Sequence, residues 1–176
     1  MPVSDKELLE KAKEVMKHAY CPYSKFPVGA ALLAEDDSII VGANCENASY
    51  GGTICAERNA MTTALALGHR KFKAVAVVTE LKNPASPCGM CRQFLIEFGN
   101  YKVIMGSSTS ANVVNATLAE LLPLAFTPAS LEYHAQETHK KISTYSKQFV
   151  CELLLNHNKV YVSFIDCLDD FPRFSG

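Results

Sequence analysis

The sequence contains no tryptophan, no block of like charge, no internal repeat and no low-complexity segment. Its 17 basic and 18 acidic residues give a net charge of −1, which excludes the strongly basic surface typical of proteins that bind nucleic acid or anionic membranes. No apolar run approaches the roughly 18 residues that a membrane-spanning helix needs. The composition therefore favours a globular protein whose partner is a small neutral molecule, with no nucleic acid and no membrane involved.

The first residues, MPVSDKELLEKAKE, also lack the basic and then apolar pattern of a signal peptide. We therefore expect a cytoplasmic protein. In the reducing cytosol the seven cysteines should be free thiols or metal ligands rather than disulfides, and their odd number agrees with this expectation.

Hydrophobic periodicity predicts alternating helices and strands over the first 123 residues. Helices are expected at residues 5–19, 55–68, 88–99 and 118–123. Strands are expected at residues 27–34, 39–43, 73–79 and 102–106. Ser4 and Glu7 form a capping box for the first helix, and Ser86 is the expected N-cap of the third, with Pro87 at its first position. This order predicts an α/β fold, a partly parallel sheet with helices on its faces.

Residues 132–176 differ in character from the preceding part. Ile142, Tyr145, Phe149 and Leu153 would mark one face of a helix, and KVYVSFID at 159–166 resembles a strand. We therefore expect a domain at 1–131 followed by an extension of unknown role at 132–176, containing a helix and a strand.

Three cysteines at predicted helix starts suggest a metal site. Cys88 and Cys91 lie three residues apart and share a helix face, and Cys55 begins the preceding helix. Three thiolates would bind Zn²⁺ and leave its fourth position for water, as in catalytic sites. Two alternatives remain: a redox Cys-x-x-Cys, or a structural site of four thiolates completed by Cys21 or Cys45.

Glu57 and Arg58 favour the catalytic alternative. A site that activates water needs a base, which Glu57 would supply, whereas a structural zinc site does not. Arg58 could donate hydrogen bonds to the thiolates and offset their excess charge, although it could equally be a solvated helix residue. Because Cys55 and Glu57 point to opposite sides of a helix, the metal should lie over the helix N-terminus.

Four segments together resemble a known family. The Cys-Ala-Glu followed by Pro-Cys-x-x-Cys is similar to the zinc-dependent nucleoside and nucleotide deaminases. More specifically, the segments similar to the small homotetrameric cytidine deaminases, over about residues 5–131, are YCPYSKFPVGAAL, NCENASYGGTICAERNA, SPCGMCRQ and ELLPLAF.

The resemblance implies a three-layer α/β/α cytidine deaminase-like fold with a mixed sheet of about five strands. It also implies deamination of cytidine and deoxycytidine in pyrimidine salvage, with Zn²⁺ as cofactor and Glu57 moving protons. By the same resemblance, the residues expected to bind substrate are Phe26 at the pyrimidine, Asn44 and Glu46 at the sugar hydroxyls, the backbone around Ala56 and Ser86 at the base, and Phe126 in a neighbouring subunit's site. Taken alone, Phe26 and Phe126 could be core residues and Asn44 a turn residue.

Two related families are alternatives. Blasticidin-type deaminases share the three-cysteine signature, but the run from Asn44 to Ala48 favours a plain nucleoside. Deaminases of nucleotides and polynucleotides usually combine His-x-Glu with basic surfaces, whereas this chain has Cys-x-Glu and a net charge of −1. Cytidine deaminase is therefore the preferred prediction.

Overall fold

A computed structural model describes residues 2–156 of the chain, with side chains as far as Ser146. The chain divides into two compact units, of which the first ends at Thr127 and the second begins at Pro128. The elements, in order, are α1 (Asp5–Met16), β1 (Val28–Ala34), β2 (Ile39–Ala43), the 3-10 turn η1 (Tyr50–Gly52), α2 (Ala56–Ala66), β3 (Phe72–Thr79), α3 (Gly89–Ile96), β4 (Lys102–Ser107), β5 (Val113–Thr117), α4 (Leu118–Leu121) and α5 (Pro128–Asn156).

The first unit is built on a mixed sheet of five strands in the order β2-β1-β3-β4-β5. β3 and β4 run parallel, whereas β1 is antiparallel to both β2 and β3, and β5 is antiparallel to β4. The parallel pair requires a crossover connection, and the chain supplies it through α3. The expected mixed α/β sheet is therefore confirmed.

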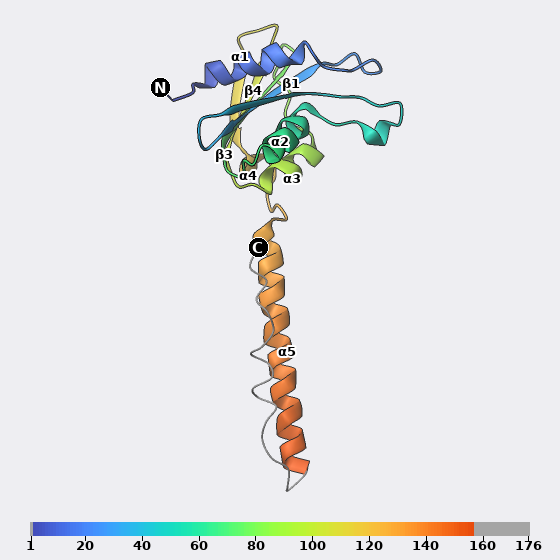
Figure 1. The fold of residues 1–176 in the computed structure, drawn as a ribbon, viewed down its shortest axis with the longest axis vertical. Coiled ribbons are helices and arrows are strands. Elements are labelled where there is room, and N and C mark those ends of the chain that lie inside the picture. The colour runs from blue at the N-terminus through green and yellow to red at the C-terminus, as the bar shows by residue number, and fades with distance from the viewer. Residues whose placement is uncertain (1, 157–176) are drawn as a thin grey trace. The chain divides into compact units, whose positions relative to one another are not determined.

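Helices cover both faces of this sheet, which gives three layers (Figure 1). On one face, Leu8 and Ala12 of α1 pack with Ala31 and Ile104. On the other face, α2 and α3 pack against the sheet, with Met61 fully buried in the larger of the two hydrophobic clusters. Burial on both faces explains why β1 and β3 are apolar along almost their whole length.

Two glycines allow the helices to lie close to the β1–β2 hairpin. A Cβ atom at Gly29 would lie 1.9 Å from the carbonyl oxygen of Ala12, and one at Gly42 would lie 2.3 Å from the backbone nitrogen of Ala60. Neither distance leaves room for a side chain, so these positions set how closely α1 and α2 approach the sheet.

Three predictions from the sequence were incorrect in detail. α1 ends at Met16 rather than Ala19, because the N–H groups of His18 and Ala19 bond the carbonyls three residues earlier and tighten the chain into a turn. The N-cap of α3 is Cys88 rather than Ser86, whose hydroxyl accepts a hydrogen bond from Arg92 instead. β5 was not predicted, since its five residues are exposed or half-buried and lack a clear alternation.

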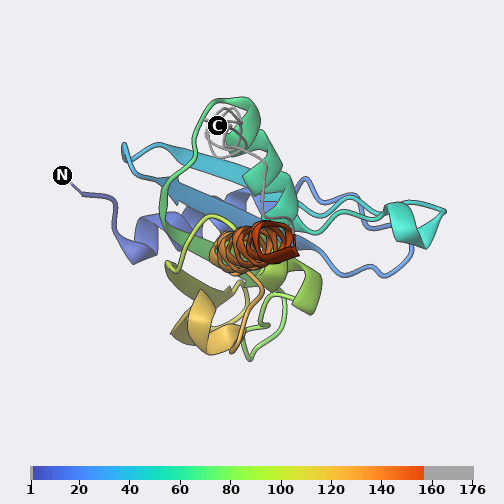
Figure 2. The same ribbon diagram turned by 90° about the horizontal axis from the view of Figure 1, so that it is seen from below.

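The loop between α1 and β1 and the loop between β2 and α2 run next to each other beside the sheet, as Figure 2 shows. Residue 20 forms an isolated bridge with residue 45, and the rings of Tyr23 and Tyr50 lie 5.7 Å apart. The carboxylate of Glu46 joins them further, because its Oε2 accepts hydrogen bonds from the N–H groups of Tyr23 and Ser24. The chain before β1 is thereby fixed to the chain after β2.

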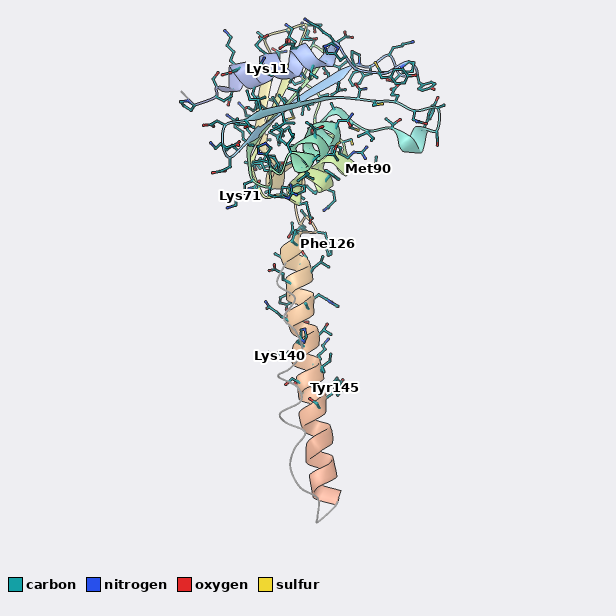
Figure 3. The ribbon with its side chains drawn as sticks, viewed as in Figure 1. Lys11, Lys71, Met90, Phe126, Lys140 and Tyr145 are labelled. Carbon is teal, nitrogen blue, oxygen red and sulfur yellow. The ribbon has the colours of Figure 1, made fainter. Side chains whose placement is uncertain are left out.

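The second unit contains the long helix α5, from which Lys140 and Tyr145 project in Figure 3. Leu131, Ile142 and Tyr145 are all more than half exposed. The strand expected at 159–166 lies outside the described residues, so it stays a prediction, as does the division of the chain at residue 131. Among residues 2–156, no helix is both long enough and apolar enough to cross a membrane.

Candidate metal centre and active site

The thiols of Cys55, Cys88 and Cys91 meet at one point of the first unit. Their three sulfur atoms all lie within 4.8 Å of one another, and the Sγ atoms of Cys55 and Cys88 are 3.9 Å apart. Cys91 is buried, Cys55 half-buried and Cys88 exposed. The structure therefore brings together the three residues that the sequence selected as metal ligands.

Helix N-termini position two of these thiols. Cys55 is the N-cap of α2 and Cys88 is the N-cap of α3, both with extended backbone and neither with a hydrogen bond from its side chain to the helix. Their sulfurs are therefore free for another role at two helix ends, where unpaired N–H groups favour negative charge. This geometry agrees with the prediction that a metal lies over the N-terminus of the helix that carries Glu57.

The sulfur spacing fits zinc. A tetrahedral ion with Zn–S bonds of about 2.3 Å separates its sulfur ligands by about 3.8 Å, close to the observed 3.9 Å between Cys55 and Cys88. Cys21 and Cys45, the alternative fourth ligands, do not belong to this cluster. In the described part of the chain, the donor set is thus three thiols, which favours a catalytic site over a closed structural one.

Contacts within the cluster shift the pKa values of two of its thiols in opposite directions. A hydrogen bond with Cys91, reinforced by Arg58 and Cys88, lowers the pKa of Cys55 to about 5 against the opposing effect of burial. The same bond with Cys55, together with burial, raises the pKa of Cys91. The lowered pKa of Cys55 favours its thiolate, the form that binds metal.

Arg58 lies against the cluster, as its position beside Glu57 suggested. Its Nη2 lies 3.7 Å from the sulfur of Cys55 and donates a 3.2 Å hydrogen bond to the carbonyl of Thr53. Its Nε is buried and has no hydrogen-bond partner within the described residues. Because an unpaired buried donor costs about 1–3 kcal/mol, anionic sulfur nearby is a suitable environment for this guanidinium.

Glu57 is almost fully enclosed beside the thiols. Its side chain is 4 % exposed, and the loss of hydration raises its pKa above the ordinary glutamate value. A carboxylate whose proton affinity is raised in this way accepts a proton more readily than an exposed glutamate does. This property suits a general acid–base.

A cavity of about 240 Å³ opens onto the cluster. Glu57, Cys55 and Cys88 line it, together with Val28, Val77 and Thr79. The residues that line it and that the family resemblance assigned to the substrate are Phe26, Asn44, Glu46 and Ser86. Its volume is slightly below the range of about 300–1,000 Å³ that is typical of small-molecule sites.

Asn44 and Glu46 are both held in place by backbone groups. The Nδ2 of Asn44 donates to the carbonyl of Phe26 at 3.0 Å, and its Oδ1 accepts from the N–H of Val28 at 2.9 Å. The Oε2 of Glu46 accepts from the N–H groups of Tyr23 and Ser24, and a hydrogen bond from the Ser24 side chain, followed by these N–H bonds, lowers the pKa of Glu46. Each side chain still has capacity for further hydrogen bonds toward the cavity.

Ala56 and Phe126, the other two residues expected to bind substrate, do not line the cavity. Ala56 is fully buried at the start of α2. Phe126 is 60 % exposed and does not line the cavity of its own subunit; it lies just before α5 in Figure 3. Its carbonyl accepts a 2.7 Å hydrogen bond from Gln93. A role for this ring thus requires a second copy of the chain.

Comparisons with known proteins agree with this geometry. Residues 2–107 match the family model described as the cytidine and deoxycytidylate deaminase zinc-binding region. The chain is 46 % identical over 132 residues to a cytidine deaminase from Sporosarcina psychrophila, which spans 74 % of this chain and 97 % of the relative. The chain belongs to the cytidine and deoxycytidylate deaminase family.

Further relatives support membership of this deaminase family. A probable cytidine deaminase from Dictyostelium discoideum is 40 % identical and covers 76 % of this chain and 90 % of its own length. The crystal structure of cytidine deaminase from Burkholderia pseudomallei superposes with a TM-score of 0.68 at 44 % identity, covering 70 % of this chain and all of that one. The fold is therefore that of the cytidine deaminases, and the cofactor of the thiol cluster is zinc.

Sequence reasoning missed two residues, Asn59 and Arg92, whose side chains hydrogen-bond segments next to this deaminase site. The Nδ2 of Asn59 donates a 2.7 Å hydrogen bond to the carbonyl of Ala43, which ties α2 to the end of β2. Arg92 donates hydrogen bonds to Ser86 and Pro87, just before Cys88, and to Leu121 of α4. Neither residue belongs to a spacing pattern with chemical meaning, and the only available signal was proximity in sequence to the cysteines.

Proposed function

We propose that this protein catalyses the hydrolytic deamination of cytidine and deoxycytidine to uridine and deoxyuridine, with release of ammonia, in pyrimidine salvage. The observation that carries the proposal is the buried Glu57, which lines one cavity with Cys55 and Cys88, two of the three clustered thiols. The site thus combines a metal donor set with an acid–base, which is what replacement of an amine by water requires.

Cys55, Cys88 and Cys91 would hold the zinc ion, which when bound supplies a Lewis acid that makes water more acidic and nucleophilic. Glu57 accepts one proton from the attacking water and delivers it to N3 of the pyrimidine; it then takes the remaining proton from the hydroxyl bonded to C4 and delivers it to the departing amine. The carbon–nitrogen bond breaks as ammonia leaves, and a carbonyl remains at C4. Arg58 offsets part of the negative charge of the thiolates.

The cavity wall would orient the nucleoside. Phe26 packs against the pyrimidine, while Asn44 and Glu46 bind the sugar hydroxyls with the hydrogen-bonding capacity that the backbone leaves free. Backbone groups around Ala56 and at Ser86 would hydrogen-bond the pyrimidine base. The acceptor groups of Glu46 favour a neutral sugar over a phosphorylated one, because a phosphate would be repelled by the carboxylate.

We propose further that the active form is a cytoplasmic homotetramer, in which Phe126 enters a neighbouring subunit's cavity. Tyr20, Tyr23, Tyr50 and Phe126 each expose between 47 % and 75 % of their surface. The first three belong to the loops that flank the cavity, so a second copy could cover them while completing the site. Light scattering of the purified protein tests this assembly; a monomer with full activity would contradict it.

An ammonia-release assay on cytidine, deoxycytidine and blasticidin S tests the reaction itself, with bound zinc measured on the same samples. We expect turnover of both nucleosides, and we expect Glu57→Gln to keep its zinc and its fold while losing nearly all activity. Glu10→Gln, on the exposed side of α1, is the matched control and should retain activity. Preference for blasticidin S would redirect the assignment, and inactivity of the natural protein on all three would end it.

A further inference from the structure

Arg92, in the first half of α3, donates hydrogen bonds to three separate groups, two of them in the segment that leads into Cys88. Its Nε donates a 2.7 Å hydrogen bond to the carbonyl of Pro87, and its Nη2 donates at 2.8 Å to the hydroxyl of Ser86. Its Nη1 donates a 2.7 Å hydrogen bond to the carbonyl of Leu121, at the end of α4. One guanidinium thus links the segment that leads into Cys88 with a helix from a distant part of the sequence.

The segment before Cys88 depends on these bonds. Residues 80–88 form a loop without regular structure. In the described part of the chain, both hydrogen bonds to residues 83–87 come from Arg92. Pro87 is buried and has no N–H of its own, and the side chain of Cys88 forms no cap bond to α3. Apart from the packing of Pro87, the hydrogen bonds from Arg92 are therefore what restrains this loop end.

The other end of the link is firmly held. α4 is only four residues long, but a capping box between Thr117 and Glu120 fixes its start, and Leu118 is fully buried. Leu121 presents one of the carbonyls that a helix end leaves unpaired, which makes it a natural acceptor for arginine. α4 can thus act as an anchor against which Arg92 holds the loop.

We propose that Arg92 is a positioning residue, which fixes Ser86, Pro87 and Cys88 against α4 so that the Cys88 thiolate and the Ser86 backbone keep their places at the cavity. This inference rests on the proposed deaminase function. It assigns Arg92 no contact with the substrate. The planar guanidinium suits the role, because it offers donors in several fixed directions, whereas a lysine ammonium at the same place could not span all three acceptors.

The test compares full-length, zinc-loaded natural protein with Arg92→Ala, Arg92→Lys and Arg70→Ala. Arg70 is a matched control, since its guanidinium also bonds carbonyls, those of Leu65 and His69, but lines no part of the cavity. For each protein, the rate of zinc transfer to an excess of chelator, the melting temperature, and kcat and KM for cytidine are measured.

Both Arg92 variants should lose zinc about 10- to 100-fold faster than the natural protein, the range typical for partners that orient metal ligands. Their KM for cytidine should rise as kcat falls, because Ser86 and Cys88 shift together. Arg70→Ala should change the zinc rate by no more than about twofold. If Arg92→Ala does not fold, Arg92→Lys and Ser86→Ala, which removes a single bond, provide the same comparison with smaller effects.

Zinc loss as slow in both Arg92 variants as in Arg70→Ala would overturn the proposal. Full restoration by lysine would overturn it too, since charge alone would then suffice. A general loss of stability would instead lower the melting temperature without a selective gain in zinc release, and that result also counts against positioning. The zinc readout does not depend on the substrate, so a natural protein that fails to deaminate cytidine would refute the proposed function without deciding the role of Arg92.

Discussion

At the level of a single residue, Arg58 places a positive charge beside the sulfur of Cys55. Hydrogen bonding to Cys55 raises the pKa of this guanidinium, and its Nη2 also binds the carbonyl of Thr53. We expect the hydrogen bond to the Thr53 carbonyl to hold the Arg58 side chain in place, so that its positive charge stabilises the Cys55 thiolate. Three thiolates around a doubly charged ion would otherwise leave a net charge of −1 and weaken the ion as a Lewis acid.

Substitution of Arg58 by alanine should therefore affect turnover more than metal content. We expect Arg58→Ala to keep most of its zinc and to lose activity by about 10- to 100-fold. Metal analysis and steady-state kinetics over a range of pH measure both effects, with Arg70→Ala again as the control. Unchanged rates at every pH would show that the guanidinium does not tune the site.

Asn44 provides a second test at this scale. In Asn44→Asp a carboxylate oxygen would replace the Nδ2 that donates to the carbonyl of Phe26, so an attraction becomes a repulsion. We expect a loss of about 1–3 kcal/mol in the free energy of unfolding, accompanied by a higher KM for cytidine. Chemical denaturation and kinetics measure the two effects.

The control for Asn44 is Asn112→Asp, because the Nδ2 of Asn112 also donates to a carbonyl, that of Lys82, but on the exposed surface. This change should cost less than about 0.5 kcal/mol. Equal losses in the two variants would mean that the position of Asn44 at the cavity carries no special importance.

At the level of elements, the approach of α2 to the β1–β2 hairpin decides where Cys55 and Glu57 lie. Gly42 is the contact point, with the backbone of Ala56 and Ala60 directly above it. Since these are backbone atoms of the helix that carries the site, they cannot move aside without moving the helix itself.

Gly42→Ala should therefore disturb both stability and catalysis. We expect a loss of about 1–3 kcal/mol or more from overpacking, and reduced turnover even in zinc-loaded protein. Gly51→Ala is the matched control, because a Cβ at Gly51 meets nothing within 4 Å. Thermal unfolding and activity assays compare them, and a fully active Gly42→Ala would show that α2 can shift without harm to the site.

Elements also differ in how well the sequence predicts them. β1 and β3 were predicted because their apolar residues face helices on both sides, which makes the signal strong. β5 was missed because Val113 and Val114 remain about half exposed at the edge of the sheet. The N-cap of α3 was misplaced by two residues, since the hydroxyl of Ser86 binds Arg92 rather than the helix.

At the scale of the whole molecule, the sheet, both hydrophobic clusters and the thiol cluster lie within residues 2–127. A chain ending at Thr127 should therefore fold, bind zinc and retain most of the activity of the full-length protein. Metal analysis, kinetics and light scattering of the two chains test this. Loss of zinc or of assembly in the shorter chain would assign residues 128–176 a role in the catalytic unit.

The sequence by itself determined the chemistry of this protein: three cysteines, a glutamate and an arginine at spacings that indicate a water-activating zinc site, on an alternation of elements that indicates an α/β sheet. Such signals are local, because ligand spacing and hydrophobic period are properties of short stretches of chain. Only the tertiary structure decided that Cys55 and Cys88 meet as the N-caps of two helices. It also decided that Asn44 bonds the backbone of Phe26, and that Arg92 links the segment before Cys88 to α4. Those contacts join residues far apart in the chain, and their partners are mostly backbone carbonyls, which every residue possesses and no sequence pattern marks.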